Sequence, residues 1–170
     1  MPDTFFQVFD GTAPVLPDRG PSALVVSACL LGDRCNYNAA ASPRTAVAAL
    51  AERYTLVAVC PEVAGGLAVP RPPAEIQPDG HVRTAEGEDV TEQYRAGAEV
   101  AVELARRHGA VGAVLKARSP SCGSNGIYDG TFTSTLTEGE GVTATALRAA
   151  GIEVVSEEDV AEGRLPGTAR

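Results

Sequence analysis

The sequence predicts a doubly wound α/β fold, because two patterns occur together along the chain. Short apolar runs rich in valine, leucine and alanine are typical of buried strands, and they alternate with segments of helical apolar spacing. Such alternation implies parallel pairing through right-handed crossovers. We therefore expect a mostly parallel sheet of about four or five strands with helices on both faces, a Rossmann-like arrangement of three layers.

The first half of the chain contains two predicted strands and one helix. The strands are expected at about 23–29 and 55–60, where runs of β-favouring residues occur. A helix is expected over about 42–53, because it opens with a Ser-Pro pair typical of an N-cap and a first helical position. Residues 61–88 contain too many prolines and glycines for a helix or a central strand, which indicates a binding loop or lid.

The second half repeats the alternation. A helix over 89–108 opens with Asp-Val-Thr-Glu, which has the capping-box spacing, and a third strand follows at 110–115. A short edge strand is expected at 131–136. A helix of small residues at 141–150 is closed by a glycine, and the fourth strand lies at 152–155.

With 170 residues, 44% of them hydrophobic and 21% charged, the chain fits one globular domain. We expect an N-terminal arm at 1–21, a single α/β domain at 22–163 and a frayed tail at 164–170. No apolar run approaches the roughly 20 residues of a membrane helix, and the N-terminus has no basic leader, so we expect a cytoplasmic protein with reduced cysteines. The net charge of −8 argues against binding long DNA or RNA.

Three of the four cysteines follow predicted strands. Cys29 and Cys60 end the first two, and Cys122 lies in a Ser-Pro-Ser-Cys-Gly segment just after the third. Ligands of open parallel sheets bind beyond the carboxyl ends of the strands, so these thiols should converge as in a metal or cluster site. Taken singly, a buried cysteine is more often a small hydrophobe than a ligand. The usual zinc-finger spacing, Cys-x-x-Cys, is absent.

Several ordered motifs together resemble the thiouracil desulfidase family. The likeness spans about residues 23–158, nearly the whole predicted domain. The motifs are Ser27-Ala-Cys-Leu-Leu-Gly32, Cys60-Pro-Glu-Val-Ala-Gly-Gly-Leu67 with Pro70-Arg71, Gly87-Glu-Asp-Val-Thr91, Leu115-Lys116, Ser119-Pro-Ser-Cys-Gly123, Tyr128-Asp-Gly-Thr-Phe132 and Gly141-Val-Thr-Ala144.

This resemblance implies a [4Fe-4S] cluster held by Cys29, Cys60 and Cys122, with one iron left open. It also implies a small thiolated uracil base or nucleotide, such as thiouracil or 4-thiouridine monophosphate, as the partner. The thiocarbonyl sulfur would bind the open iron, and water would replace it at carbon to give the uracil form and sulfide. Cys35, the fourth cysteine, is expected not to be a ligand, because a fourth thiolate would close the reactive iron.

Within that family scheme, Glu62 is expected to be the acid/base that handles water, since it lies two residues from a predicted ligand. The alternative is a loop carboxylate paired with Arg71. Ser119 would orient the base or relay a proton. Ser121, Lys116 and Arg71 are assigned to substrate binding, although each basic side chain taken alone is more often a solvated surface residue.

One segment departs from the family pattern. Where relatives usually carry Arg-Tyr-Asp-Gly after the first loop, this chain has Asn36-Tyr-Asn-Ala39, which affects substrate contacts there but not the cluster. Two other functions fit the same residues: a sulfur carrier with a persulfide on Cys122, and a non-catalytic iron–sulfur or zinc module. A broad brown absorption in an anaerobic sample would exclude the colourless options, and turnover of a thiolated base would separate an enzyme from an inert module.

Overall fold

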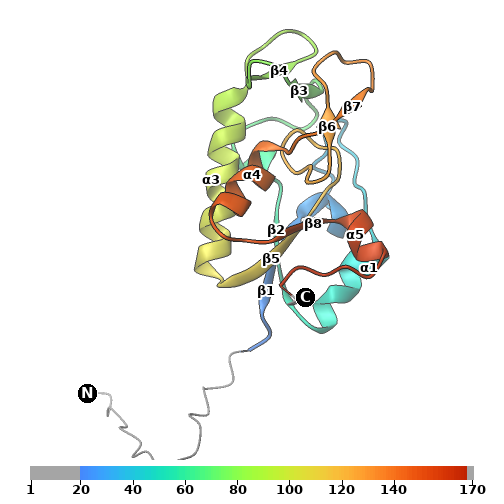
Figure 1. Cartoon of the computed structure of the whole chain (residues 1–170), viewed down its shortest axis with the longest axis vertical. Helices are drawn as coiled ribbons and strands as arrows, with labels where there is room; N and C mark the ends of the chain where they lie inside the picture. Colours follow the sequence, from blue (N-terminus) through green and yellow to red (C-terminus); the bar gives the residue numbers. More distant parts are fainter. Residues whose placement is uncertain (1–19, 168–170) are drawn as a thin grey trace, which may run out of the picture.

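A parallel sheet of four strands forms the centre of the molecule (Figure 1). The computed structural model describes residues 20–167. The strands are ordered β2-β1-β5-β8, and neighbours pair in parallel throughout. Their bounds are β1 Ala23–Ser27, β2 Thr55–Val59, β5 Ala110–Leu115 and β8 Val154–Ser156. The predicted α/β fold with a parallel sheet is therefore confirmed.

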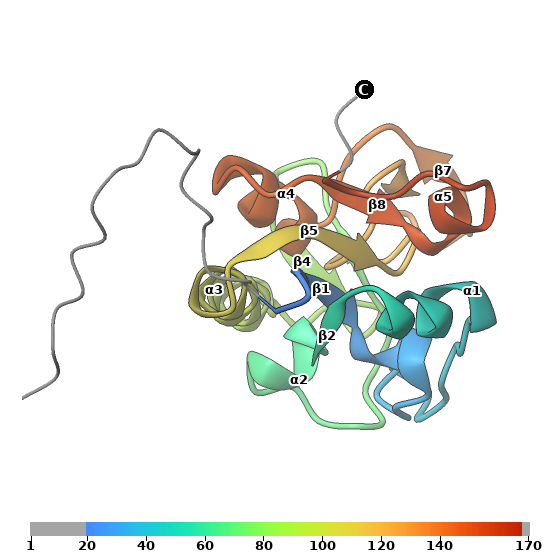
Figure 2. The same cartoon turned by 90° about the horizontal axis from the view of Figure 1, so that it is seen from below.

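Helices cover both faces of this sheet (Figure 2). One face carries α3 Thr91–Arg107 and α4 Val142–Ala149, which pack against each other. The other face carries α1 Thr45–Ala48, continued by a 3-10 turn at Ala49–Glu52, and α5 Glu157–Ala161. The arrangement is the doubly wound, three-layer architecture that the alternation of elements predicts.

Alternating side chains of β1 fill both layers of the core. Val25 packs with Ala101 of α3 on one side of the sheet, whereas Leu24 and Val26 pack with Val47 of α1 on the other. All five residues of β1 are buried, as expected for a central parallel strand covered on both faces. Each large apolar side chain buried in this way contributes about 1.5–3 kcal/mol. The core therefore fixes the strand from whose end the candidate site is built.

The direction of winding reverses at β1. From β1 the chain passes through α1 to β2 on one side, and from β2 it passes through α3 to β5 on the other side of β1. Connections at the carboxyl ends of β1 and β5 therefore leave in opposite directions, which opens the crevice where α/β proteins bind ligands. Residues that follow β1, β2 and β5 line one cavity there.

A short helix, α2 Pro61–Ala64, follows β2 and rests on α3 through two glycines. A Cβ atom at Gly65 would lie 1.9 Å from a backbone oxygen of α3, and one at Gly97 would lie 1.8 Å from a backbone oxygen of α2. Neither position has room for a side chain, so the two backbones touch directly. This contact fixes the segment that contains Cys60 and Glu62.

Two antiparallel hairpins lie side by side at one end of the molecule (Figure 1). In the first, β3 Ala74–Ile76 pairs with β4 Val82–Thr84. In the second, β6 Ile127–Tyr128 pairs with β7 Leu136–Thr137. Gln77, which follows β3, connects the two hairpins, because its side-chain amide donates a hydrogen bond to the Gly130 carbonyl at 3.2 Å.

Several predicted boundaries differ from the structure for identifiable reasons. The segment 61–88 is not one long loop, because α2 and the β3–β4 hairpin fit between its prolines, and strands outside the main sheet tolerate flanking prolines. The edge strand predicted at 131–136 instead forms a hairpin loop, and only its last residue is paired. Helix α1 begins at Thr45, after the Ser-Pro pair. Helix α5 is missing from the sequence prediction, although its capping box at 156–159 has a recognisable spacing.

The chain ends are described in part. The predicted arm at 1–21 lies outside the described residues except for its last two. The predicted tail is packed as far as residue 167, because Pro166 is buried and Arg164 forms an ion pair with Asp159. The expectation of a frayed tail is therefore wrong for this part of it. Among the described residues, no helix has the length and apolar character needed to cross a membrane.

Replacement of Gly97 by alanine is expected to destabilise the protein. The new methyl group would meet the backbone of α2, and overpacking typically costs about 1–3 kcal/mol. We expect this cost to exceed the roughly 1 kcal/mol that alanine gains over glycine inside a helix. Urea unfolding of Gly97→Ala should therefore show a lower midpoint. Gly20→Ala is the control, because nothing lies within 4 Å of its Cβ position. A Gly97→Ala variant as stable as wild type would contradict the direct backbone contact.

Candidate metal centre

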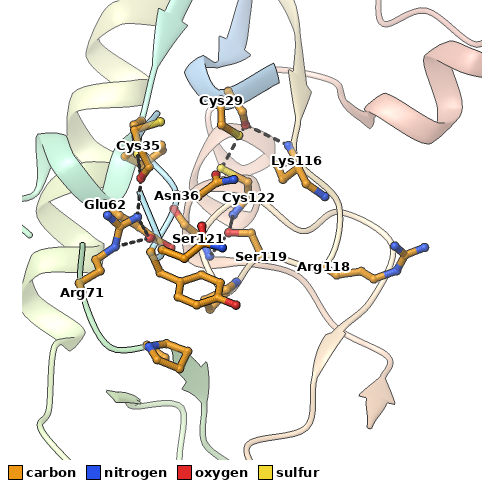
Figure 3. A pocket seen from close by; sticks show the side chains of 18 of the residues that line it. Cys29, Cys35, Asn36, Glu62, Arg71, Lys116, Arg118, Ser119, Ser121 and Cys122 are labelled. Atoms are coloured by element: carbon orange, nitrogen blue, oxygen red, sulfur yellow. Dashed lines mark hydrogen bonds and ion pairs between the residues drawn. The ribbon is translucent and has the colours of Figure 1, made fainter. Parts of the chain in front are cut away.

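A cavity of about 620 Å³ opens beyond the carboxyl ends of β1, β2 and β5, and all four cysteines of the chain line it. Its volume lies in the range of small-molecule binding sites. Figure 3 shows labelled side chains from segments far apart in the sequence gathered around this cavity. The cysteine side chains therefore lie in the crevice that the strand order predicts.

The three predicted ligands come from three different connections. Cys29 lies in a 3-10 turn, η1 Ala28–Leu31, that directly follows β1. Cys60 is the N-cap residue of α2, and Cys122 lies in the loop after β5. These side chains line one cavity, as the strand-end argument predicts. Cys35 lines the same cavity from the loop after η1, a position that the strand pattern does not indicate.

The loop that carries Cys122 is held from two sides. Ser119 Oγ accepts hydrogen bonds from the N–H groups of Ser121 at 3.1 Å and Cys122 at 3.0 Å. From the first turn of α4, the Thr143 N–H donates to the Ser121 carbonyl at 2.8 Å. A Cβ atom at Gly141 would lie 2.3 Å from that carbonyl oxygen, so α4 approaches as closely as glycine allows. The cysteine is therefore presented by a fixed backbone.

One hydroxyl group connects β1, β5 and the Cys122 sulfur. Ser27 Oγ accepts a hydrogen bond from the Lys116 N–H at 2.9 Å and donates to Cys122 Sγ at 3.2 Å. Because the oxygen already accepts from an N–H, the hydroxyl proton is directed to the sulfur, and this direction favours the thiolate form. Hydrogen bonds to cysteine sulfur are a general means of tuning iron–sulfur groups.

Burial disfavours isolated thiolates in this cavity. Removal from water, together with the neighbouring Cys35 and Cys60, raises the pKa of Cys29 to about 12. Burial likewise raises the pKa of Cys122 to about 12, against the lowering effect of the Ser27 hydroxyl. The pKa of Cys35 is also raised to about 12, by burial and then by Cys60. Several thiolates would become stable here together with a cationic metal group.

The thiols that line the cavity are the donor type that an iron–sulfur cluster requires. Within residues 20–167, no three His, Cys, Asp or Glu side chains surround one point closely enough to hold one metal ion. The thiolates of a cluster bind different iron atoms, so its ligands need not share one point. Thiols from three strand ends, one of them hydrogen-bonded to Ser27, therefore fit the group that the resemblance implies.

Glu62 lines the cavity from the first turn of α2 and is held by two side chains. Arg71 Nε donates to Glu62 Oε2 at 2.8 Å (Figure 3). The hydroxyl of the buried Tyr94 donates to Oε1 at 2.9 Å. Burial lowers the pKa of Arg71, but Glu62, together with Cys60 and Tyr94, outweighs burial, so the pKa is raised. The ion pair between Glu62 and Arg71, the alternative role of this carboxylate, is present. It also fixes a carboxylate at the cavity wall.

The predicted substrate contacts line the cavity but already have partners within the protein. The Arg71 guanidinium is paired with Glu62. Lys116 Nζ lies 2.9 Å from Oε1 of Glu157, whose side chain is only 3% exposed. The Ser121 hydroxyl lies 2.8 Å from a threonine hydroxyl of α4. Their roles in substrate binding remain predictions. To contact a substrate, each side chain would have to share its present hydrogen bond or ion pair with the substrate, or break it.

The segment that departs from the family pattern also borders the cavity. Asn36, Tyr37 and Asn38 all line it. Asn36 Nδ2 donates to Ser42 Oγ at 3.1 Å, which ties the segment to the chain ahead of α1. Ala39 has a φ of 57°, in the left-handed region that glycine adopts without strain. Alanine therefore strains a turn at the position where the family pattern has glycine.

Several residues at the site give no functional signal in the sequence. Tyr94 lies on the buried side of α3 and resembles an ordinary core residue until Glu62 is placed beside it. Ser27 and Glu157 act through contacts with residues distant in the chain. Cys35 is the one residue that residue type alone could have placed here, because the sequence contains so few thiols.

Comparison with known proteins agrees with the resemblance in the motifs. Residues 24–159 match the family model described as 2-thiouracil desulfurase. The chain is 40% identical over 146 residues to the uncharacterized protein YbbK of Bacillus subtilis (strain 168), a match that covers 81% of this chain and 97% of that protein. It is also similar to the solved structure of the [4Fe-4S]-dependent thiouracil desulfidase TudS, with a TM-score of 0.77, 45% sequence identity and coverage of 83% and 94% of the two chains. The chain therefore belongs to the 2-thiouracil desulfurase family.

Proposed function

We propose that this protein is a [4Fe-4S]-dependent desulfidase that removes sulfur from a small thiolated uracil, either the free base or a mononucleotide such as 4-thiouridine monophosphate. The observation that carries the proposal is the presence of Cys29, Cys60, Cys122 and Glu62 on one cavity. Family membership and the similarity to TudS support the same chemistry. Oxygen from water replaces sulfur at one carbon, so the products are the uracil form and sulfide.

Cys29, Cys60 and Cys122 are the proposed ligands. Bound there, the cluster would supply an iron atom that acts as a Lewis acid toward the thiocarbonyl sulfur. The hydroxyl of Ser27 would stabilise the Cys122 thiolate, since it donates to that sulfur. Cys35 stays outside the ligand set in this proposal, although it lines the cavity. A fourth thiolate would occupy the position that substrate needs.

Glu62 and Ser119 are the proposed catalytic residues. Arg71 and Tyr94 hold the Glu62 carboxylate at the cavity wall, where it can accept a proton from the attacking water. Ser119 Oγ already accepts two backbone N–H groups, so its own proton is free to be donated to a polar atom of the pyrimidine. Glu62 would thus accept a proton, whereas Ser119 would donate a hydrogen bond that orients the base.

A small substrate suits both the cavity and the charge of the chain. A volume of about 620 Å³ accommodates a base or a mononucleotide, and a net charge of −8 disfavours a long phosphate backbone. Ser121, Lys116 and Arg71 would contact the substrate by sharing their present bonds. We further propose that the domain at 22–163 works in the cytoplasm, where reduced thiols persist, and all four cysteines are free.

Anaerobic turnover assays on a series of substrates test the proposed function. The cluster-loaded protein should release sulfide from 2-thiouracil, 4-thiouracil or 4-thiouridine monophosphate with higher catalytic efficiency than from thiolated tRNA, because the acidic chain lacks the cations that tRNA docking needs. A higher catalytic efficiency for tRNA would refute the small-substrate assignment. A brown, cluster-loaded protein that releases no sulfide from any of them would be a non-catalytic module.

Glu62→Gln is expected to keep the cluster and lose most of its turnover. Glutamine preserves the size of the side chain, and its amide oxygen can still accept from Arg71 while its amide N–H donates to the Tyr94 oxygen, but it cannot take up a proton at neutral pH. Loss of one general acid/base typically costs about 10²- to 10⁴-fold. Single-turnover rates should be compared with those of Glu92→Gln, which alters an exposed carboxylate on α3. An unchanged rate in cluster-loaded Glu62→Gln would remove Glu62 from the mechanism.

Serine variants of the four cysteines test the ligand set. Cys29→Ser, Cys60→Ser and Cys122→Ser should each lose cluster content, since each removes a proposed thiolate ligand. Cys35→Ser should retain both the brown absorption and the activity. Iron and acid-labile sulfide, measured per folded chain after anaerobic reconstitution, give the readout. Loss of assembly in Cys35→Ser would show a four-thiolate cluster and would contradict the open iron position.

A further inference from the structure

Phe132 combines an exposed ring with an unfavourable backbone conformation. Its φ is 57°, in the left-handed region, where a bulky side chain is rare and strained. The residue is 39% exposed, so it does not gain the full burial of a core side chain that would offset the strain. Glycine or asparagine would form the same turn at lower cost. The fold itself therefore gains little from a phenyl ring at this position.

A buried carboxylate imposes this conformation. Glu75 of β3 is 8% exposed, and its Oε2 accepts hydrogen bonds from the N–H groups of Gly130 at 2.9 Å and Phe132 at 3.0 Å. Within the loop, the Asp129 N–H donates to the Thr135 carbonyl at 3.0 Å. Strained residues persist only where their surroundings over-determine them, and they cluster at functional sites. The β3–β4 hairpin thus holds Phe132 in place from the neighbouring element.

The ring belongs to the wall of the cavity that contains the cysteines. Tyr37, which is 50% exposed, lines the same cavity from the loop after η1. Within residues 20–167, Tyr37 and Phe132 are the two exposed side chains of the tyrosine and phenylalanine type, and both border this one site. Aromatic faces presented to a ligand site are the usual platforms for planar rings.

We propose that Phe132 stacks on the pyrimidine ring of the substrate and that Glu75 is the residue that positions it. This inference rests on the proposed function, since it requires a pyrimidine in the cavity. The hydrogen bond to Glu75 fixes the loop backbone, so the Phe132 ring is in position before the substrate binds. Less conformational entropy is then lost on binding. Stacking would set the plane of the base, and the polar groups on the cavity wall would then set its rotation within that plane.

Phe132→Gly separates binding from folding. The variant should raise both the dissociation constant for uracil and the Michaelis constant for thiouracil roughly 5- to 150-fold, the loss expected for one base–aromatic stack. Its thermal unfolding midpoint should not fall, because glycine adopts the left-handed conformation without strain. Uracil binding is measured by calorimetry on protein of equal iron content. Phe132→Tyr, which keeps the aromatic face, should retain wild-type affinity.

Leu136→Ala is the matched control, because Leu136 is 52% exposed near the same loop and does not line the cavity. It should leave uracil affinity unchanged. Unchanged uracil affinity in Phe132→Gly, or a drop in its unfolding midpoint, would overturn the stacking role. The ring would then stabilise the fold or bind a partner instead. If wild-type protein desulfurates thiouracil while Phe132→Gly shows the same Michaelis constant, only this inference fails. If loaded wild type neither binds uracil nor releases sulfide, the proposed function fails with it.

A double-mutant cycle tests the positioning role of Glu75. Glu75→Ala should weaken uracil binding in the wild-type background and have no further effect in Phe132→Gly, because the carboxylate acts through the ring. Equal losses of affinity in both backgrounds would show that Glu75 does not act through Phe132. The cycle compares the loss of uracil affinity that Glu75→Ala causes in the two backgrounds. A general loss of stability would lower the affinity in both backgrounds, which differs from the expected result.

Discussion

Three parallel strand ends meet at one edge of the sheet, and the whole candidate site depends on this meeting. β1 lies between β2 and β5, so the segments that follow these strands are neighbours whatever their separation in the sequence. Cys29, Cys60 and Cys122 line one cavity for that reason. The same strand order reverses the winding of the chain at β1, and this reversal opens the crevice that the cavity occupies.

Contacts around the sheet edge make the cavity a fixed site with polar walls. Gly97 lets α3 touch α2, and Gly141 lets α4 touch the Cys122 loop, so two of the three connections rest directly on helix backbones. Burying a charge is costly unless it is paired. The carboxylates of Glu62 and Glu157 are accordingly paired with Arg71 and Lys116. Groups fixed in this way need little reorganisation when a substrate binds.

Sequence patterns predicted the parts of the structure that depend on local chemistry. The sequence indicates the central strands, the long helix α3 and the cysteines after the strands. Each of these features depends on the hydrophobic period and residue types of one short segment. The β3–β4 hairpin was not predicted, since its strands are short and flanked by prolines. The partners of Ser27 and Phe132 could not be predicted either, because Cys122 and Glu75 reach them only through the tertiary fold.

Mössbauer spectroscopy of the wild-type protein, reconstituted anaerobically with iron and sulfide, examines the proposed cluster directly. A cluster held by Cys29, Cys60 and Cys122 leaves one iron without a protein thiolate, because Cys35 is not expected to bind it. We expect one iron atom per cluster to give a distinct signal that changes when thiouracil is added. Four irons of equivalent thiolate ligation, with no response to thiouracil, or a folded chain that assembles no cluster, would contradict a three-cysteine site with an open iron.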